Sequence, residues 1–349
     1  MNNEVIEVYI FNFNGRNTIL STLESLYKSE DVKISVSIID DHSTDDSLKI
    51  AKEKFPEVAI HILPYNTKKL NILRNKALNL GTSKYVFITD NDLNFDKHCL
   101  SELLKIMESD EKIASCTPRL MHWDKPEIVY TAGTKVHYLG AAISEQRDKV
   151  YDPTKDKISS NSGGGITLLR REAALKVGGF DENFMLGWGD DGEFYQRLLR
   201  AGYNCLYVPT AFALHENKIV DKIRKFRVIG QTYNRWLFIF SHYSVILLFL
   251  LIPVFIIYEL MQAAFVIVKG VFPEYIKGNL LIVQNFKQFI EKRKAVQKIK
   301  IVSDKNALYS GELYVAPALI KKYSFLKYGI SALSAIFNFY WKLIQPIIP

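Results

Sequence analysis

Short apolar segments alternate with amphipathic ones over the first ninety residues. Residues 5–11 and 34–39 are apolar and β-branched, as buried strands are, and residues 17–29 between them carry apolar side chains at helical spacing. Strand, helix and strand in this order predict a βαβ unit with a right-handed crossover. The pattern then repeats, with a helix capped by Ser or Thr over 43–53, a strand over 58–63, a helix over 70–80 and a strand over 84–89. It predicts a doubly wound α/β domain that binds a nucleotide.

Polar side chains follow three of these strands directly. Asn12 follows the first, Asp40 and Asp41 the second, and Asp90-Asn91-Asp92 the last. Ligands of open α/β sheets bind beyond the carboxyl ends of the strands, so we expect these residues to meet at one edge. Neither a G-x-G-x-x-G sequence after the first strand nor a G-x-x-x-x-G-K-[ST] sequence is present, which argues against dinucleotide and P-loop sites.

Each of the two acidic clusters can either bind a ligand or serve only as a turn or helix cap. Asp90 and Asp92, one residue apart at a strand end, can share Mg²⁺ or Mn²⁺ and bridge it to a diphosphate, although an Asp/Asn turn looks the same. A carboxylate at 40 or 41 can accept from a base N–H or a ribose hydroxyl. Ser43 or Thr44 can also cap the next helix, and capping alone is the plain alternative.

A third segment combines glycines with carboxylates. Gly164 and Gly165 allow a ligand to approach the backbone closely. Further along, Trp188 precedes Asp190, Asp191 and Glu193 at the start of a predicted helix. Acids in a first helical turn are ordinary dipole partners, but one of them can also serve as a general base.

Charge is unevenly distributed along the 349 residues, whose net charge is +8. Residues 217–349 contain 19 Lys and Arg against 6 Asp and Glu, whereas residues 1–216 contain 26 against 31. We therefore predict an acidic catalytic domain over 1–216 and a basic region over 217–349. Three cysteines without ligand spacing argue against a disulfide framework and a zinc site, and the first residues do not resemble a signal peptide.

The basic region is also apolar, which favours a membrane surface over nucleic acid as its partner. Residues 236–258 have about the length needed to span a bilayer, but Ser241, His242 and Pro253 interrupt them and basic residues lie on both sides. We expect an interfacial or re-entrant helical element here and over 323–349, with a buried helical appendage as the alternative. Residues 284–304 predict an exposed basic helix.

Residues 4–216 resemble family 2 glycosyltransferases of the GT-A fold, with the matching motifs in the family's order. Ile38–Asp45 resembles the nucleotide-binding V-D-D-G-S-T-D, with His42 in place of glycine, and Asp90-Asn91-Asp92 resembles the D-x-D metal motif. The remaining matches are Val8–Asn14, Arg74-Asn75, Arg170-Arg171, Gly178–Glu182, Asp190-Asp191, Arg197, Gly202-Tyr203, Pro209 and His215. Residues 188–193 also resemble the W-G-G-E-[DN]-x-E segment of N-acetylgalactosamine-type transferases, some of which retain configuration.

The resemblance implies an inverting transfer from a UDP-, dTDP- or GDP-sugar to a lipid-linked or glycan acceptor, without nucleic acid. It implies that Asp92, Asp90 and His215 hold Mn²⁺ or Mg²⁺ and that Asp191, beside Asp190, is the base. The nucleotide sugar would contact the residues Asn12, Asp40, Asp41, Arg74, Asp90, Gly164, Gly165 and Trp188. Similarity to rhamnosyl-type enzymes also implies a membrane-held domain, and the basic flanks of the apolar run predict that it lies on the cytoplasmic side. A nucleotidyltransferase and an inactive sugar-nucleotide sensor are the rivals.

Overall fold

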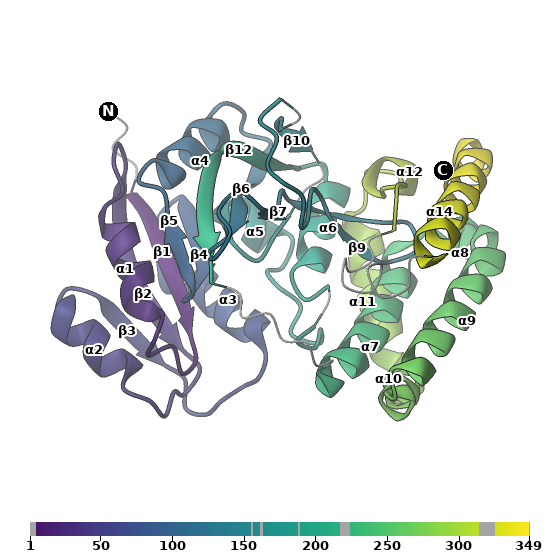
Figure 1. The fold of residues 1–349 in the computed structure, drawn as a ribbon, viewed down its shortest axis with the longest axis horizontal. Coiled ribbons are helices and arrows are strands. Elements are labelled where there is room, and N and C mark those ends of the chain that lie inside the picture. The colour runs from purple at the N-terminus through teal and green to yellow at the C-terminus, as the bar shows by residue number, and fades with distance from the viewer. Residues whose placement is uncertain are drawn as a thin grey trace.

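Hydrophobic strands pair into one mixed sheet at the centre of the N-terminal part of the molecule (Figure 1). The computed structural model describes residues 5–154, 156–160, 163–187, 189–216, 224–313 and 325–348. The strands are β1 Val5–Asn12, β2 Lys33–Asp40, β3 Ala59–Ile62, β4 Tyr85–Asp90, β5 Leu93–Phe95, β6 Ile113–His122, β7 Val129–Thr131, β8 Thr134–Val136, β9 Ala142–Ser144, β10 Ser159–Ser160, β11 Thr167–Arg170 and β12 Asn204–His215.

The strand order is that of a doubly wound sheet with antiparallel insertions. Over the described residues the order is β10-β12-β6-β11-β4-β1-β2-β3, with β5 added to β12 and β7 to β6, and β8 and β9 form a separate two-stranded antiparallel sheet. Strands β4, β1, β2 and β3 are mutually parallel, whereas β11 runs antiparallel to both β4 and β6. Because β1, β2 and β4 are parallel, their carboxyl ends Asn12, Asp40 and Asp90 lie at one edge of the sheet. The predicted α/β mixed sheet is confirmed.

Helices cover both faces of this sheet, and the helices that follow β12 form a second, helical part of the molecule. The helices are α1 Ile19–Tyr27, α2 Ser47–Lys54, α3 Leu70–Leu80, α4 Cys99–Glu108, α5 Arg171–Lys176, α6 Gly192–Arg200, α7 Lys225–His242, α8 Val245–Leu250, α9 Ile252–Val268, α10 Phe272–Gln284, α11 Phe286–Ile299, α12 Asp304–Ala307, α14 Phe325–Ile344 and the 3₁₀ turn η1 Gln345–Ile347. Alternate side chains of β1 enter two cores, one shared with α1, α2 and α4 and the other with α3, α5 and α6. This two-sided burial explains the continuous apolar runs of the central strands.

The predicted elements of the first ninety residues form close to their predicted positions, with one local error. The helix over 43–53 begins only at Ser47, and its N-cap residue Asp46 makes no side-chain capping bond. Ser43 instead donates from its hydroxyl to Asp40 Oδ1 at 2.6 Å. The expected Ser/Thr cap is therefore wrong, because the hydroxyl is engaged at the strand end.

The apolar run of 236–258 is divided among three helices. It covers the end of α7, all of α8 and the start of α9, with breaks at Tyr243-Ser244 and Leu251. In the described ranges, no helix is both long and apolar enough to cross a membrane. Buried residues of α7, α8, α9 and α14 instead share a third core, which also includes Tyr138 and Leu139 next to β8 and Phe184 before α6.

The helix predicted over 284–304 is α11 with the end of α10, and it is exposed as predicted except along one buried side. Phe289 and Val296 are buried, and Lys292 on the same side is only 12% exposed. The helical part therefore packs against the α/β part through both apolar and charged groups.

Candidate active site

Asn12 connects the ends of β1, β2 and β4. Its amide donates to Asp40 Oδ1 at 2.7 Å and to Ser47 Oγ at 2.9 Å, and its Oδ1 accepts from Asn91 at 2.6 Å. A Cβ at Gly15 would overlap the amides of Asn12 and Asn91, so only glycine fits beside them. Asn12 and Asp40 are almost fully buried, and their described side-chain hydrogen bonds are with other residues of the protein. These two residues therefore shape this edge of the sheet.

Asp41 holds the loop that precedes α3. Its Oδ1 accepts from the backbone N–H of Thr67 at 2.8 Å and from the Thr67 hydroxyl at 2.9 Å. Lys68 has a φ of 55°, in the left-handed region, and its N–H lies 3.3 Å from Asp41 Oδ2. The carboxylate compensates for the absence of glycine in this loop by fixing its backbone.

His42 occupies a glycine-type backbone position. Its φ is 64°, and its Nδ1 lies 3.1 Å from the carbonyl oxygen of Leu63. The matching motif has glycine here, a residue that adopts positive φ without strain. The chain therefore keeps the turn geometry of that motif with a different side chain.

Asp92 and His215 form a pair beside the end of β4. Strand β5 pairs with β12 and sets Leu93 opposite His215, which brings His215 Nε2 to 3.4 Å from Asp92 Oδ1. Asp92 Oδ1 and His215 Nδ1 are buried atoms without a hydrogen-bond partner among the described residues. The pKa of Asp90 is raised to about 6, mainly by burial and secondly by the nearby charge of Asp92. Arg74 and His215 act in the opposite direction and lower this pKa.

Arg74 joins α3 to the acidic turn before α6. It is 3% exposed, and its Nη1 lies 3.0 Å from Asp190 Oδ2 and 2.8 Å from Asn71 Oδ1. Asp191 is the N-cap residue of α6, where its Oδ1 accepts from the N–H of Gly192 at 2.7 Å. Burial raises the pKa of Asp191, the Asp190 carboxylate raises it further, and Arg74 acts in the opposite direction.

Gly165 lies between these charged groups. A Cβ placed on it would be 3.4 Å from Arg74 Nη2 and 3.7 Å from Asp191 Oδ2, so a glycine keeps the backbone open there. The neighbouring Gly164 accepts at its carbonyl from the Tyr195 hydroxyl. Trp188, the other residue expected at this end of the site, lies outside the described residues.

The structure thus brings Asp90, Asp92, Asp190 and Asp191 together around Arg74, whereas the described contacts of Asp40 and Asp41 are with neighbouring loops. Asp92, Arg74, His215 and Asp190 all influence the ionisation of Asp90. Within the described part of the chain, however, no group of three or more His, Cys, Asp or Glu side chains has a metal-binding arrangement. Asp92 and His215 form a two-residue arrangement, which fits a small cation only if other ligands complete the shell, as substrate phosphates do for Mg²⁺.

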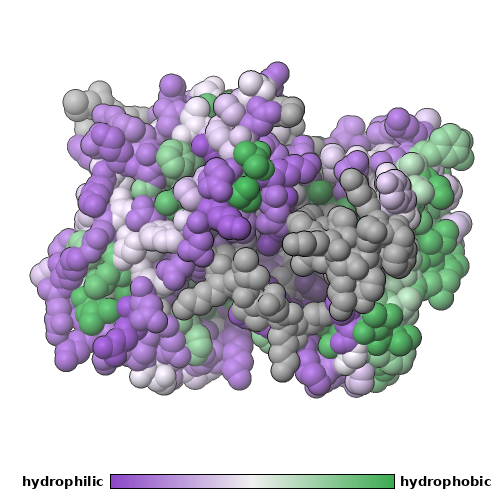
Figure 2. All heavy atoms as spheres, viewed as in Figure 1, coloured by the Kyte–Doolittle hydropathy of each residue, from purple (hydrophilic) through white to green (hydrophobic). Residues whose placement is uncertain are grey.

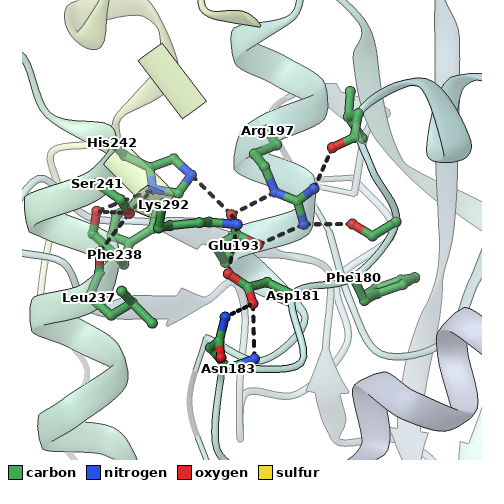
Figure 3. A network of polar contacts seen from close by, with 12 residues as sticks. Phe180, Asp181, Asn183, Glu193, Arg197, Leu237, Phe238, Ser241, His242 and Lys292 are labelled. Carbon is green, nitrogen blue, oxygen red and sulfur yellow. Dashed lines mark hydrogen bonds and ion pairs between the residues drawn. The ribbon is translucent and has the colours of Figure 1, made fainter. Parts of the chain in front are cut away.

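A buried charge cluster behind this site was not predicted (Figure 3). Glu193 in α6 accepts from Arg197 at 2.6 and 2.8 Å, and Lys292 of α11 lies 2.8 Å from the same carboxylate. The sequence does carry a signal for it. Lys292 lies three residues after Phe289 and four before Val296, so helical spacing puts it on the buried side of α11.

Comparison with known proteins relates this chain to glycosyltransferases. Residues 7–178 match the family model of glycosyl transferase family 2, and residues 147–220 match the model described as the N-terminal domain of galactosyltransferase. The O-antigen chain rhamnosyltransferase WbaN of Salmonella anatum is 27% identical over 189 residues, which are 53% of this chain and 57% of that relative. The chain therefore spans less than two thirds of that protein.

Two further proteins are similar over comparable lengths. An N-acetylglucosaminyl-diphospho-decaprenol L-rhamnosyltransferase of Mycobacterium tuberculosis is 24% identical over 220 residues, 55% of this chain and 70% of that relative. A crystal structure of GalNAc-T7 with UDP, GalNAc and Mn²⁺ superposes with a TM-score of 0.56 at 16% identity, covering 70% of this chain and 49% of the other. At that identity, the likeness bears on the fold alone.

Proposed function

We propose, on the premise that this chain carries a family 2 glycosyltransferase domain, that it transfers a sugar from a nucleotide sugar to a lipid-linked or polysaccharide acceptor. One observation supports this function above the others. Asp191 is a half-buried carboxylate with a raised pKa, and it lies beside the Arg74–Asp190 pair and near the acids at the end of β4. Glycosyl transfer requires a general base close to groups that stabilise the negative charge of the leaving diphosphate.

The proposed reaction is an inverting displacement at the anomeric carbon. An acceptor hydroxyl oxygen forms the new bond to that carbon while the bond to the diphosphate oxygen breaks. Asp191 takes the hydroxyl proton, and the nucleoside diphosphate leaves with the bonding electron pair. Arg74, held by Asp190, stabilises negative charge near the leaving group.

A divalent cation fits the groups at the end of β4. Asp92 and His215, with Asp90 beside them, would hold Mn²⁺ or Mg²⁺ together with the oxygens of the diphosphate. When bound, the cation would neutralise charge on the departing diphosphate. The orphaned Asp92 Oδ1 is the observation that supports this site.

The substrates follow from the relatives and from residue chemistry. Both curated relatives carry rhamnosyltransferase names, and one name specifies a diphospho-decaprenol acceptor. We infer a nucleotide-activated hexose or deoxyhexose, with UDP, dTDP or GDP as carrier, and a polyprenyl-diphosphate-linked glycan as acceptor. Asn12, Asp40 and Asp41 shape the nucleotide end, and Gly164 and Gly165 would lie near the sugar.

A membrane-facing surface suits such an acceptor. Apolar side chains gather at the end of the molecule where α9 and α14 lie (Figure 2), including Leu260 at 67%, Val268 at 76% and Phe339 at 71% exposure. A groove of about 900 Å³ opens among α7, α8 and α9 and is lined by Phe249, Phe255 and other apolar residues. We propose that this end rests on the cytoplasmic face of a membrane, where the buried cysteines stay free.

Retention of configuration is the second candidate outcome. The match of residues 147–220 to a galactosyltransferase model includes the turn with Asp190 and Asp191. The product's anomeric configuration distinguishes it from inversion.

The test of the proposed function offers the full chain a panel of UDP-, dTDP- and GDP-sugars, with and without Mn²⁺ and with a polyprenyl-diphosphate glycan. We expect metal-dependent release of nucleoside diphosphate and a glycosylated lipid. Binding without release would favour a sensor, and release of pyrophosphate from a nucleoside triphosphate and a sugar phosphate would favour a nucleotidyltransferase. Either result would overturn the proposal.

A further inference from the structure

Lys292 contacts two acidic residues of the α/β part at once. Its Nζ lies 2.8 Å from Glu193 Oε1 and 2.8 Å from Asp181 Oδ2 (Figure 3). The Lys292 side chain is 12% exposed, that of Asp181 9% and that of Glu193 1%. Water screens such contacts weakly, so they constrain geometry more than a surface ion pair does.

The carboxylate of Glu193 has a strong local partner already. Arg197, one turn further along α6, donates two bonds to it and also donates to the carbonyls of Val177 and Gly179 at 2.6 Å. His242 of α7 adds a contact at 3.4 Å. The contact that Lys292 alone supplies, among the described ion pairs, is the one to Asp181.

Asp181 begins the segment that ends in the acidic turn. Its Oδ1 accepts from the N–H of Asn183 at 2.9 Å, and its carbonyl accepts from Asn71 Nδ2 at 2.8 Å. The same Asn71 amide donates to the carbonyl of Asp190 at 2.8 Å. Helix α3 therefore fixes this segment from one side, and α11 fixes it from the other.

We propose that Lys292 of the C-terminal helix α11 is a positioning residue for the Asp190-Asp191 turn, acting through Asp181 and Glu193. The C-terminal helices then complete the active site in addition to facing a membrane. This inference rests on the proposed function, because Asp191 matters for catalysis only if the chain transfers a sugar.

The variant Lys292→Met removes the cation and keeps most of the side-chain volume. We expect kcat to fall about a hundredfold, as misplacement of a reacting group by about 1 Å does, with little change in the donor KM. The donor KM is spared because Asn12 and Asp41 lie at the far strand ends and keep their contacts. Lys292→Arg should restore most of kcat, and Lys294→Met, an exposed change two residues along α11, should have no effect.

A second variant guards against misfolding of the first. Asp181→Asn removes the other end of the contact and leaves Glu193 paired with Arg197, so it should lower kcat in the same way. The two substitutions should be non-additive, because both break the contact between Lys292 and Asp181. A folded Asp181→Asn or Lys292→Met protein with wild-type kcat would overturn the proposal.

Hydrogen exchange of the backbone over 181–191 tests the positioning without any substrate. We expect faster exchange there in Lys292→Met and in Asp181→Asn, and unchanged exchange in Lys294→Met. Unchanged exchange in both of the first two variants would refute the positioning role. A wild-type chain that transfers no sugar while the variants show faster exchange would refute the proposed function alone.

Discussion

At the scale of single residues, Asp191 is the proposed general base, a carboxylate whose pKa is raised by burial and by Asp190. Replacing its carboxylate by an amide in Asp191→Asn removes the proton acceptor and keeps the shape. We expect kcat to fall by about a hundred- to ten-thousand-fold, the usual contribution of a base. Donor binding, measured as a thermal shift with nucleotide sugar, should persist because the nucleotide contacts lie elsewhere.

The matched control for this substitution is Glu172→Gln. Glu172 is an exposed acid in the first turn of α5, so its replacement should leave kcat unchanged. Full turnover by Asp191→Asn would remove Asp191 from the mechanism, and loss of donor binding would show that it holds the nucleotide sugar instead.

Motif chemistry predicted the residues at strand ends but not their internal partners. Asp90, Asp92 and His215 come together because β5 returns along β12, a pairing between strands far apart in the sequence. Asp40 was expected to meet a ligand, yet its carboxylate oxygens accept from the Asn12 amide and from the backbone N–H and hydroxyl of Ser43. A sequence shows that an acidic residue follows a strand. Whether its carboxylate accepts hydrogen bonds from a ligand or from the protein depends on tertiary contacts.

At the scale of helices and their contacts, two buried histidines make stability depend on pH. Burial lowers the pKa of His242 on α7 and of His137 after β8 to about 4, from an ordinary value of 6.5. The unfolded chain therefore binds these protons first as pH falls. The free energy of unfolding is unaffected above about pH 6.5 and decreases toward pH 4, by at most about 3 kcal/mol per histidine.

The variant His242→Gln should flatten this dependence. Urea unfolding at pH 7.5 and at pH 5 should show a smaller difference than in the wild type, whereas His98→Gln, at a site 44% exposed, should keep the wild-type difference. An identical pH dependence in His242→Gln and the wild type would show that His242 does not titrate in this range.

The contact between α6 and α12 depends on a buried ion pair. Arg200 Nη1 lies 2.5 Å from Asp304 Oδ1, and both side chains are fully buried. Asp304→Ala leaves the guanidinium without its carboxylate, so we expect the free energy of unfolding to fall by about 3–5 kcal/mol. Urea denaturation measures the change.

An exposed ion pair provides the comparison. Asp46→Ala removes the partner of Arg16, where the two side chains are 57% and 62% exposed, and should cost less than about 1 kcal/mol. Equal losses in the two variants would mean that Asp304 does not hold α12 against α6.

At the scale of the whole molecule, local patterns predicted the α/β part and gave little about how the helical part docks. The strands and α3 follow from periodicity because both faces of the sheet are buried locally. The third core joins Tyr138 and Phe184 to helices from beyond residue 224, and no local pattern encodes that pairing. A run such as 236–258 is apolar whether it faces lipid or another helix, so its division into α7, α8 and α9 could not be predicted.

The exposed apolar end should bind anionic vesicles. The net positive charge of residues 217–349 adds an attraction that salt weakens, so co-sedimentation with vesicles should decline from low to high ionic strength. Phe249 and Leu260 are 68% and 67% exposed, and burying one such side chain contributes about 1.5–3 kcal/mol. The double change to Asp at both positions should therefore weaken vesicle binding by about a hundredfold or more.

The control for this experiment is Ile62→Asp, an equally drastic change at a site 58% exposed on the edge strand β3 of the α/β part. It should bind vesicles like the wild type, because β3 lies at the opposite end of the molecule from α9 (Figure 1). Equal weakening in both proteins would mean that general charge, and not the α8–α9 surface, governs attachment. Wild-type binding by the double variant would show that this surface faces a protein partner or solvent instead of lipid.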